Sequence, residues 1–190
     1  MLHRLHWPPR PLGLGTPFNS ALATREMRAA FVRASWQYVL LGIATVLVIG
    51  ALDQLLFAGV SVQRIRTVGA QPFGVRCIIV LYSAVTEELI FRLLISTLIA
   101  WLMVRVLARF GRLANSVAVW SGILVAAVLF GLAHVPNLAH VPHPYLRAIT
   151  LNGVAGIVLG WLYWRRGLEA AILAHLAADA TAYLAIASFL

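Results

Sequence analysis

The chain has 190 residues, 62% of them hydrophobic, and its mean hydropathy is +0.89. This length suits one domain, and the composition is too apolar for a soluble globular protein but normal for one that crosses a membrane several times. All 15 basic residues are arginine, and the formal net charge is +9. Because the arginines lie at the ends of apolar runs and not along one amphipathic face, we exclude nucleic acid as a partner. With Cys77 as its single cysteine, the chain forms no intrachain disulfide.

Residues 1–35 are predicted to form a basic tail on the cytoplasmic side of the membrane. Prolines and glycines are concentrated in the first half of this tail and prevent a long helix there. A short interfacial helix that leads into the first span is predicted from Arg25, Arg28, Phe31 and Arg33. No apolar core follows the first few residues, so we do not expect a cleaved signal peptide.

Residues 36–190 are predicted to fold as one membrane-embedded, all-α bundle of about five to six transmembrane helices around a polar cavity, since each apolar run approaches the ~20 residues that cross a bilayer. The expected spans lie at roughly 36–58, 76–107, 115–135, 146–164 and 168–190. The second run would be ~48 Å long as one helix, so it either tilts strongly or breaks near its two glutamates. Residues 60–74 are expected to be a connector, and Gly153, Gly156 and Gly160 predict a close contact between helices.

The distribution of arginine predicts the orientation in the membrane. With the N-terminus in the cytoplasm, the segments on that side hold ten arginines, and the segments on the opposite side hold four, Arg147 among them. Asp53, near the far end of the first span, is expected at a solvated interface. Abundant Ala, Leu and Arg without lysine are typical of GC-rich bacteria, so we expect an integral protein of the bacterial inner membrane.

Two adjacent carboxylates and an arginine lie inside the second apolar run. A charge at bilayer depth costs at least a few kcal/mol, so such residues usually face a polar cavity or one another. On a helix, residues i and i+4 share a face, whereas residues i and i+1 point about 100° apart. We therefore expect Glu88 to pair with Arg92, and Glu87 to be left without a countercharge and available as a general base or acid. The plain alternative is a buried ion pair that only holds two helices together.

Three further ionisable residues lie in the later apolar runs. His134 ends the third run, and His175 and Asp179 stand one helical turn apart on the last, within reach of one another. A carboxylate beside an imidazole fixes the tautomer of that ring. The plain alternatives are an interface histidine and a self-satisfied polar pair, but ionisable groups on three apolar helices predict one shared cavity. In straight spans the two histidines would lie at different depths, so either the helices tilt or the loop after His134 dips back into the membrane.

These residues occur in three ordered motifs that resemble the CPBP family, which comprises CAAX proteases and bacteriocin-processing enzymes and is also called the Abi family of intramembrane glutamic endopeptidases. The motifs read Glu87-Glu88-Leu-Ile-Phe-Arg92, Phe130-Gly-Leu-Ala-His134 and His175-Leu-Ala-Ala-Asp179. The similarity covers roughly residues 76–185 and includes the Gly-Leu-x-Ala-Ala-Ile-Leu-Ala run that begins at Gly167. Any one motif is weak evidence, whereas three in order on predicted spans are fairly specific.

The resemblance implies an all-helical membrane core around a conical cavity, and hydrolysis of a peptide bond without a metal. The substrate would be a membrane-anchored protein or peptide with a CAAX-like or C-terminal sorting signal. Glu87 with His134 would activate a water molecule. His175 and Asp179 would stabilise the oxyanion of the tetrahedral intermediate. The supporting residues would be Glu88 and Arg92.

The chain departs from the family pattern at two positions. Leu93 stands where the family often has glycine, and Asp179 stands where it commonly has asparagine. An ionised aspartate cannot donate a hydrogen bond to an oxyanion. Asp179 would therefore either be protonated in a low-dielectric site or orient His175, which would then donate alone.

Two other classes of protein stay open at this point. In a zinc-dependent membrane protease, Glu87, His134 and His175 would bind the metal, although the sequence has neither a His-x-x-x-His motif nor a cysteine pair. Further candidate ligands are His140 and His143. A non-enzymatic membrane protein would be an immunity or binding protein, or a transporter that uses the carboxylates as a proton relay. The full set of motif residues favours the peptidase, with no cofactor.

Overall fold

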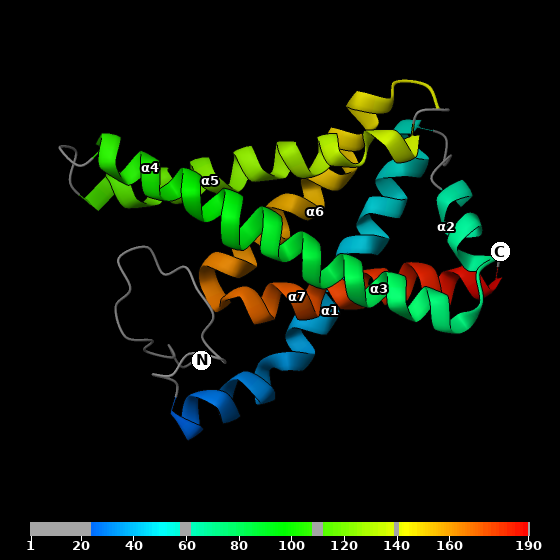
Figure 1. Cartoon of the computed structure of the whole chain (residues 1–190), viewed down its shortest axis with the longest axis horizontal. Coiled ribbons are helices and arrows are strands. Elements are labelled where there is room, and N and C mark those ends of the chain that lie inside the picture. Colours follow the sequence, from blue (N-terminus) through cyan, green and yellow to red (C-terminus); the bar gives the residue numbers. More distant parts are fainter. Residues whose placement is uncertain (1–23, 58–61, 108–111, 139–140, 190) are drawn as a thin grey trace.

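The computed structural model describes residues 24–57, 62–107, 112–138 and 141–189, which are mostly helical and include no β-strand (Figure 1). Five helical stretches within these ranges are long and apolar enough to cross a membrane. They are Arg25–Phe57, Phe73–Leu107, Asn115–Asn137, Pro144–Arg166 and Leu168–Ser188. The predicted all-α membrane bundle is therefore confirmed.

The first helix, α1 (Arg25–Phe57), is continuous. The predicted interfacial helix is the first part of α1 and not a separate element, because no proline or glycine interrupts the chain between Arg25 and Trp36. Residues 1–23 of the predicted tail lie outside the described residues, and the boundary of the tail stays a prediction. Within the predicted connector the chain forms a short helix, α2 (Val62–Gly69), which packs against the end of the last span.

The long second run continues past the two glutamates without a break. Its parts are α3 (Phe73–Glu88), the π-helix η1 (Leu89–Ser96) and α4 (Thr97–Leu107). In the π-helix the hydrogen bonds skip one residue more than in an α-helix, and both the N–H and the hydroxyl of Thr97 bond to the carbonyl oxygen of Arg92, five residues back. Segments of this kind are rare and occur often at functional sites. The helix thus changes its winding, and does not break, directly after the glutamates.

Glycines let the later helices approach closely. These helices are α5 (Arg112–Ala133), α6 (Pro144–Arg166) and α7 (Leu168–Ala180), with the short segments η3 (Val135–Leu138), η4 (Thr181–Ala185) and η5 (Ile186–Phe189). A Cβ atom at Gly156 would lie 2.8 Å from the Cα of Ala127, and one at Gly160 would lie 2.9 Å from Cγ2 of Ile123. The predicted close contact is confirmed for these two positions, on the α5–α6 interface. At Gly153 the nearest atom would be 3.9 Å away, an ordinary contact.

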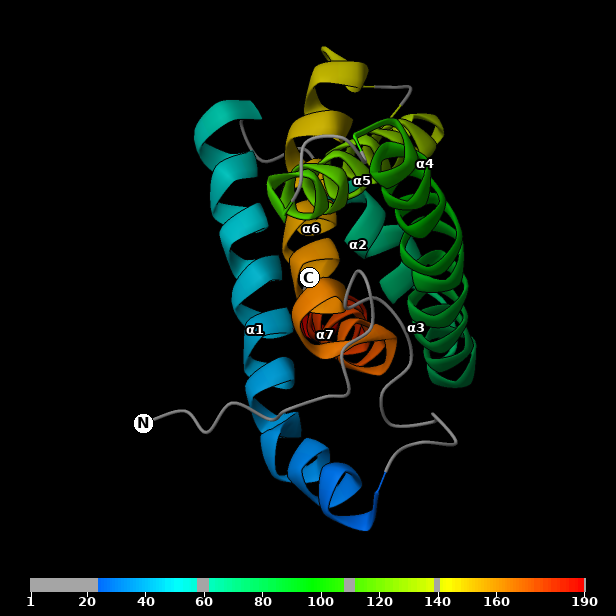
Figure 2. The same ribbon diagram turned by 90° about the vertical axis from the view of Figure 1, so that its left-hand side faces the viewer.

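The helices are inclined to one another around the centre of the bundle. Figure 2 shows α6 and α7 between α1 on one side and α3 with α4 on the other. A Cβ atom at Gly42 would lie 2.0 Å from the carbonyl oxygen of Ala174, so α1 and α7 cross with their backbones in contact. α1 and α6 run obliquely across α7 (Figure 1). This inclination brings together residues that straight, parallel spans would place at different depths.

Asp53 does not lie at a solvated interface, so the expectation for this residue is wrong. Its side chain on α1 forms an ion pair with Arg147 in the first turn of α6. Both residues are buried, with 3% and 1% of their surfaces exposed. The prediction of orientation counted Arg147 among the arginines on the outer side of the membrane, but its charge is buried in the bundle. The Asp53 carboxylate is neutralised by an arginine from a distant helix and not solvated by water. The position of Asp53 within its own span does not predict this partner.

Candidate active site

One cavity of about 190 Å³ collects the reactive residues of all three motifs. It is bounded by side chains from α1, α2, α3, α5, α6 and α7 with the segments that follow α5 and α7. Its lining includes Glu87, His134, His175 and Asp179. The sequence therefore identified four ionisable residues that the fold brings into one largely apolar cavity.

Glu87 faces two imidazole rings that come from two other helices. Its Oε2 atom lies 3.9 Å from Nε2 of His134 and 3.7 Å from Nε2 of His175. Nδ1 of His134 lies 2.8 Å from the carbonyl oxygen of Phe130, which only accepts hydrogen bonds, so Nδ1 carries the proton. The Nε2 atom of a neutral His134 is therefore an acceptor turned toward Glu87. A carboxylate between two such rings is suited to hold and activate a water molecule.

Glu88 is completely buried and has two partners. Its Oε2 atom lies 3.1 Å from Nε of Arg92, so the predicted pair within one helix is present. Its Oε1 atom lies 2.8 Å from Nδ1 of His175. Because a carboxylate only accepts, His175 donates through Nδ1 and turns Nε2 toward the cavity. Glu88 thus fixes the tautomer and the orientation of His175.

Asp179 does not orient His175, contrary to one of the two expected roles. Its Oδ1 atom lies 3.8 Å from Nε2 of His175, which is too long for a hydrogen bond. Its Oδ2 atom accepts a hydrogen bond from the hydroxyl of Ser83 on α3. The carboxylate that holds His175 comes from the neighbouring helix and not from the next turn of the same helix, because α3 and α7 lie side by side at this level.

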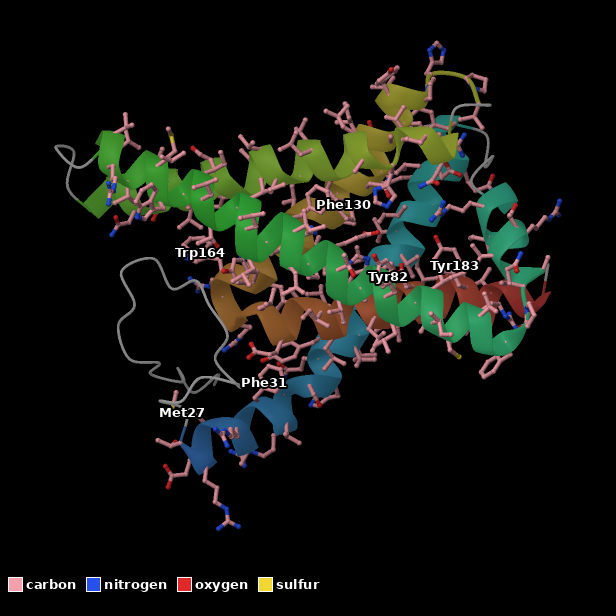
Figure 3. All side chains as sticks on the ribbon, viewed as in Figure 1. Met27, Phe31, Tyr82, Phe130, Trp164 and Tyr183 are labelled. Carbon is pink, nitrogen blue, oxygen red and sulfur yellow. The ribbon has the colours of Figure 1, made fainter. Side chains whose placement is uncertain are left out.

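Phe130 lies on α5, in the interior of the bundle (Figure 3). It is 2% exposed, and its ring centroid lies 4.7 Å from that of His134 and 6.0 Å from that of His175. The guanidinium of Arg92 lies 4.8 Å from the same ring, and its two terminal nitrogens have no hydrogen-bond partner among the described residues. The aromatic face takes the place of such a partner for the cation. The ring of Phe130 therefore packs against both histidines and the arginine, a contact that the motif pattern alone does not show.

A second polar pair in the cavity lies outside the three motifs. Nε of Arg64 on α2 donates to the hydroxyl of Tyr183 in η4 over 3.1 Å, and both residues line the cavity. Arg64 lies in the predicted connector, and Tyr183 is not among the predicted site residues. The sequence spacing could have identified Tyr183 as a site residue. It follows Asp179 by four residues and His175 by eight, which places all three on one helix face.

The zinc alternative stays a prediction. Within residues 24–57, 62–107, 112–138 and 141–189, no three His, Cys, Asp or Glu side chains are arranged to hold a metal ion. His143 lies just before α6, and His140 is outside the described residues.

Apolar helices of spanning length around a cavity that collects ionisable side chains define an integral membrane protein. The sequence model of the Type II CAAX prenyl endopeptidase Rce1-like family matches residues 70–181. This match covers more than half of the chain and all three motifs, and the chain belongs to this family of CAAX-type membrane proteases. The resemblance stated above is thereby confirmed. Comparisons with curated proteins and with solved structures gave no significant match.

Proposed function

We propose that the protein is an intramembrane glutamic endopeptidase in which Glu87 is the general base. The observation that carries this proposal is the position of its Oε2 atom, within 4 Å of Nε2 of His134 and of His175. Glu87 is about a quarter exposed, whereas Glu88 is fully buried and committed to two partners. Only Glu87 of the two glutamates is therefore accessible to a water molecule and a peptide.

The reaction that these groups support is direct attack of water on a peptide carbonyl. Glu87 takes a proton from the water, and the water oxygen bonds to the carbonyl carbon. The π electrons of the carbonyl bond move to the carbonyl oxygen, which becomes an oxyanion. His134 accepts a hydrogen bond from the same water. The C–N bond then breaks as the proton moves from Glu87 to the leaving nitrogen. His175, oriented by Glu88, donates to the oxyanion through Nε2 only in its doubly protonated form.

The proposed substrate is a membrane-anchored peptide or protein with a CAAX-like or C-terminal sorting signal. Support comes from the family and from the lining of the cavity, in which aliphatic side chains such as Val46, Ile79 and Leu159 surround the polar residues. We place the protein in the bacterial inner membrane with its N-terminus in the cytoplasm, as its arginine distribution predicts. No metal is assigned to the reaction.

The test is cleavage of a library of membrane-anchored peptides by the purified protein in detergent. Glu87→Gln should lower kcat/KM at least ~100-fold, because the amide cannot take a proton from water. Glu26→Gln makes the same chemical change at an exposed position at the start of α1 and should leave cleavage unchanged.

Two further results would change the proposal. Loss of cleavage with a chelator, restored by zinc, would assign Glu87 and the two histidines to a metal site. A wild-type protein and a Glu87→Gln variant that are both inactive on a broad library would favour the binding or transport alternative.

A further inference from the structure

The oxyanion of the proposed reaction needs a hydrogen-bond donor that is already in place. A single such donor typically contributes ~10²- to 10³-fold to kcat. The two predicted donors do not offer one in the arrangement described above. Asp179 is an acceptor for the Ser83 hydroxyl, and the Nδ1–H of His175 is taken by Glu88. A neutral His175 has no proton on Nε2.

Two other polar side chains in the cavity are bonded within their own helices. The hydroxyl of Thr45 donates its hydrogen to the carbonyl oxygen of Leu41 over 2.7 Å. The amide of Asn152 donates one of its two hydrogens to the carbonyl oxygen of Ala148 over 3.2 Å, which ties this side chain to α6. Asn137 also lines the cavity, but it lies on the exposed turn η3. Its side chain forms no hydrogen bond with a described residue that would fix its position.

Tyr183 is held from two directions. Nε of Arg64 donates to its hydroxyl oxygen over 3.1 Å, and Nη1 of Arg76 donates to its backbone carbonyl oxygen over 3.2 Å. The guanidinium takes a lone pair of the phenol and leaves the phenolic hydrogen for another acceptor. None of the described residues accepts that hydrogen.

The neighbours of the hydroxyl make it a strong donor with a fixed position. A hydrogen bond received from a cation polarises the O–H bond, and linked hydrogen bonds strengthen one another. The side chain is half-buried on the same helix face as His175 and Asp179, two turns and one turn earlier. A held, polarised donor at the edge of an apolar cavity is the arrangement that stabilises developing negative charge.

We propose that the hydroxyl of Tyr183 is a catalytic hydrogen-bond donor to the oxyanion, with Arg64 as its positioning residue. The inference rests on the proposed function, in which Glu87 takes the proton of the attacking water. The phenol keeps its proton throughout: it forms one hydrogen bond to the carbonyl oxygen as the C=O π electrons move there, and it loses that bond when the carbonyl re-forms. Tyr183 thereby supplies the donor that Asp179 does not.

The experiment compares Tyr183→Phe with Tyr82→Phe in the purified full-length protein. Tyr82 lies on the outer face of α3 and is 69% exposed, so its variant controls for the loss of one hydroxyl (Figure 3). With the best-cleaved peptide of the library, Tyr183→Phe should lower kcat roughly 100-fold and change KM less than about twofold. Tyr82→Phe should leave both constants unchanged. The unfolding midpoint of each variant in detergent reports whether the fold is kept.

A tetrahedral phosphonate built on the same peptide separates catalysis from structure. An anionic mimic of the intermediate should bind Tyr183→Phe more weakly by about the factor lost in kcat/KM, since it shares the transition-state contact. Unchanged phosphonate binding beside a lower kcat would overturn the proposal. Should Tyr183→Phe fail to fold, Arg64→Met keeps the Tyr183 hydroxyl but removes the group that donates to it, and phosphonate binding as tight as that of the wild type would likewise overturn the proposal.

The Glu87→Gln variant distinguishes a failure of the Tyr183 proposal from a failure of the proposed function. An inactive Glu87→Gln protein beside a fully active Tyr183→Phe protein overturns only the role of Tyr183. An active Glu87→Gln protein removes the proposed function, and the inference about Tyr183 with it.

Discussion

Two buried carboxylate–arginine pairs in the described part of the chain have the same chemistry and different surroundings. Glu88 and Arg92 are one turn apart on one helix, and the carboxylate also holds His175 beside the cavity. Asp53 and Arg147 join α1 to α6, and neither residue lines the cavity. A buried ion pair is weak evidence for stability, because desolvation of the two charges offsets most of their attraction. The comparison therefore suggests that the first pair serves the site and the second pair serves helix packing.

Replacement of both partners of the site pair should have the largest effect. Glu88→Leu with Arg92→Leu removes two charges together but also removes the acceptor of the Nδ1–H of His175. Loss of such an orienting carboxylate lowers activity by ~10- to 10⁴-fold, and we expect a fall in kcat/KM within this range. A double variant that cleaves within tenfold of the wild type would show that Glu88 has no role beyond the ion pair.

Loss of one partner of the packing pair should act on stability alone. Asp53→Asn leaves Arg147 buried without its countercharge, which typically costs about 3–5 kcal/mol of unfolding free energy. The measurement is reversible unfolding in mixed detergent, with Glu26→Gln as the control at an exposed position. The fraction that stays folded should cleave with an unchanged kcat. An unchanged stability would mean that water or lipid reaches Arg147 and replaces Asp53.

Replacement of both partners of the packing pair should have the smallest effect. Asp53→Leu with Arg147→Leu removes both desolvation costs, and the unfolding free energy should stay the same or rise by up to about 4 kcal/mol. Cleavage should stay within about twofold of the wild type. A loss of activity comparable with that of the Glu88 and Arg92 double variant would contradict the division into a site pair and a packing pair.

The sequence predicted what depends on local spacing. The pairing of Glu88 with Arg92 follows from four residues of separation on a helix, and the close α5–α6 contact follows from Gly156 and Gly160. The helical membrane bundle follows from the length of the apolar runs. Three motifs in order were enough to identify residues that line one cavity.

Contacts between distant helices could not be predicted in the same way. Glu88 is 87 residues from His175, and Arg64 is 119 residues from Tyr183. Which helix faces meet depends on crossing angles and on the close approach at glycines, and a single sequence does not encode these locally. The spacing of His175 and Asp179 therefore suggested a partnership that the fold gives to Glu88 instead.

The π-helix Leu89–Ser96 has a consequence for how the length of this chain can vary. A π-helix turns less per residue than an α-helix, so its eight residues rotate the chain about as far as seven α-helical residues would. Removal of one residue from this segment would therefore allow regular α-helical winding and leave α3 and α4 close to their present alignment. A relative with a one-residue gap at this place could thus keep both glutamates facing the cavity on an uninterrupted α-helix.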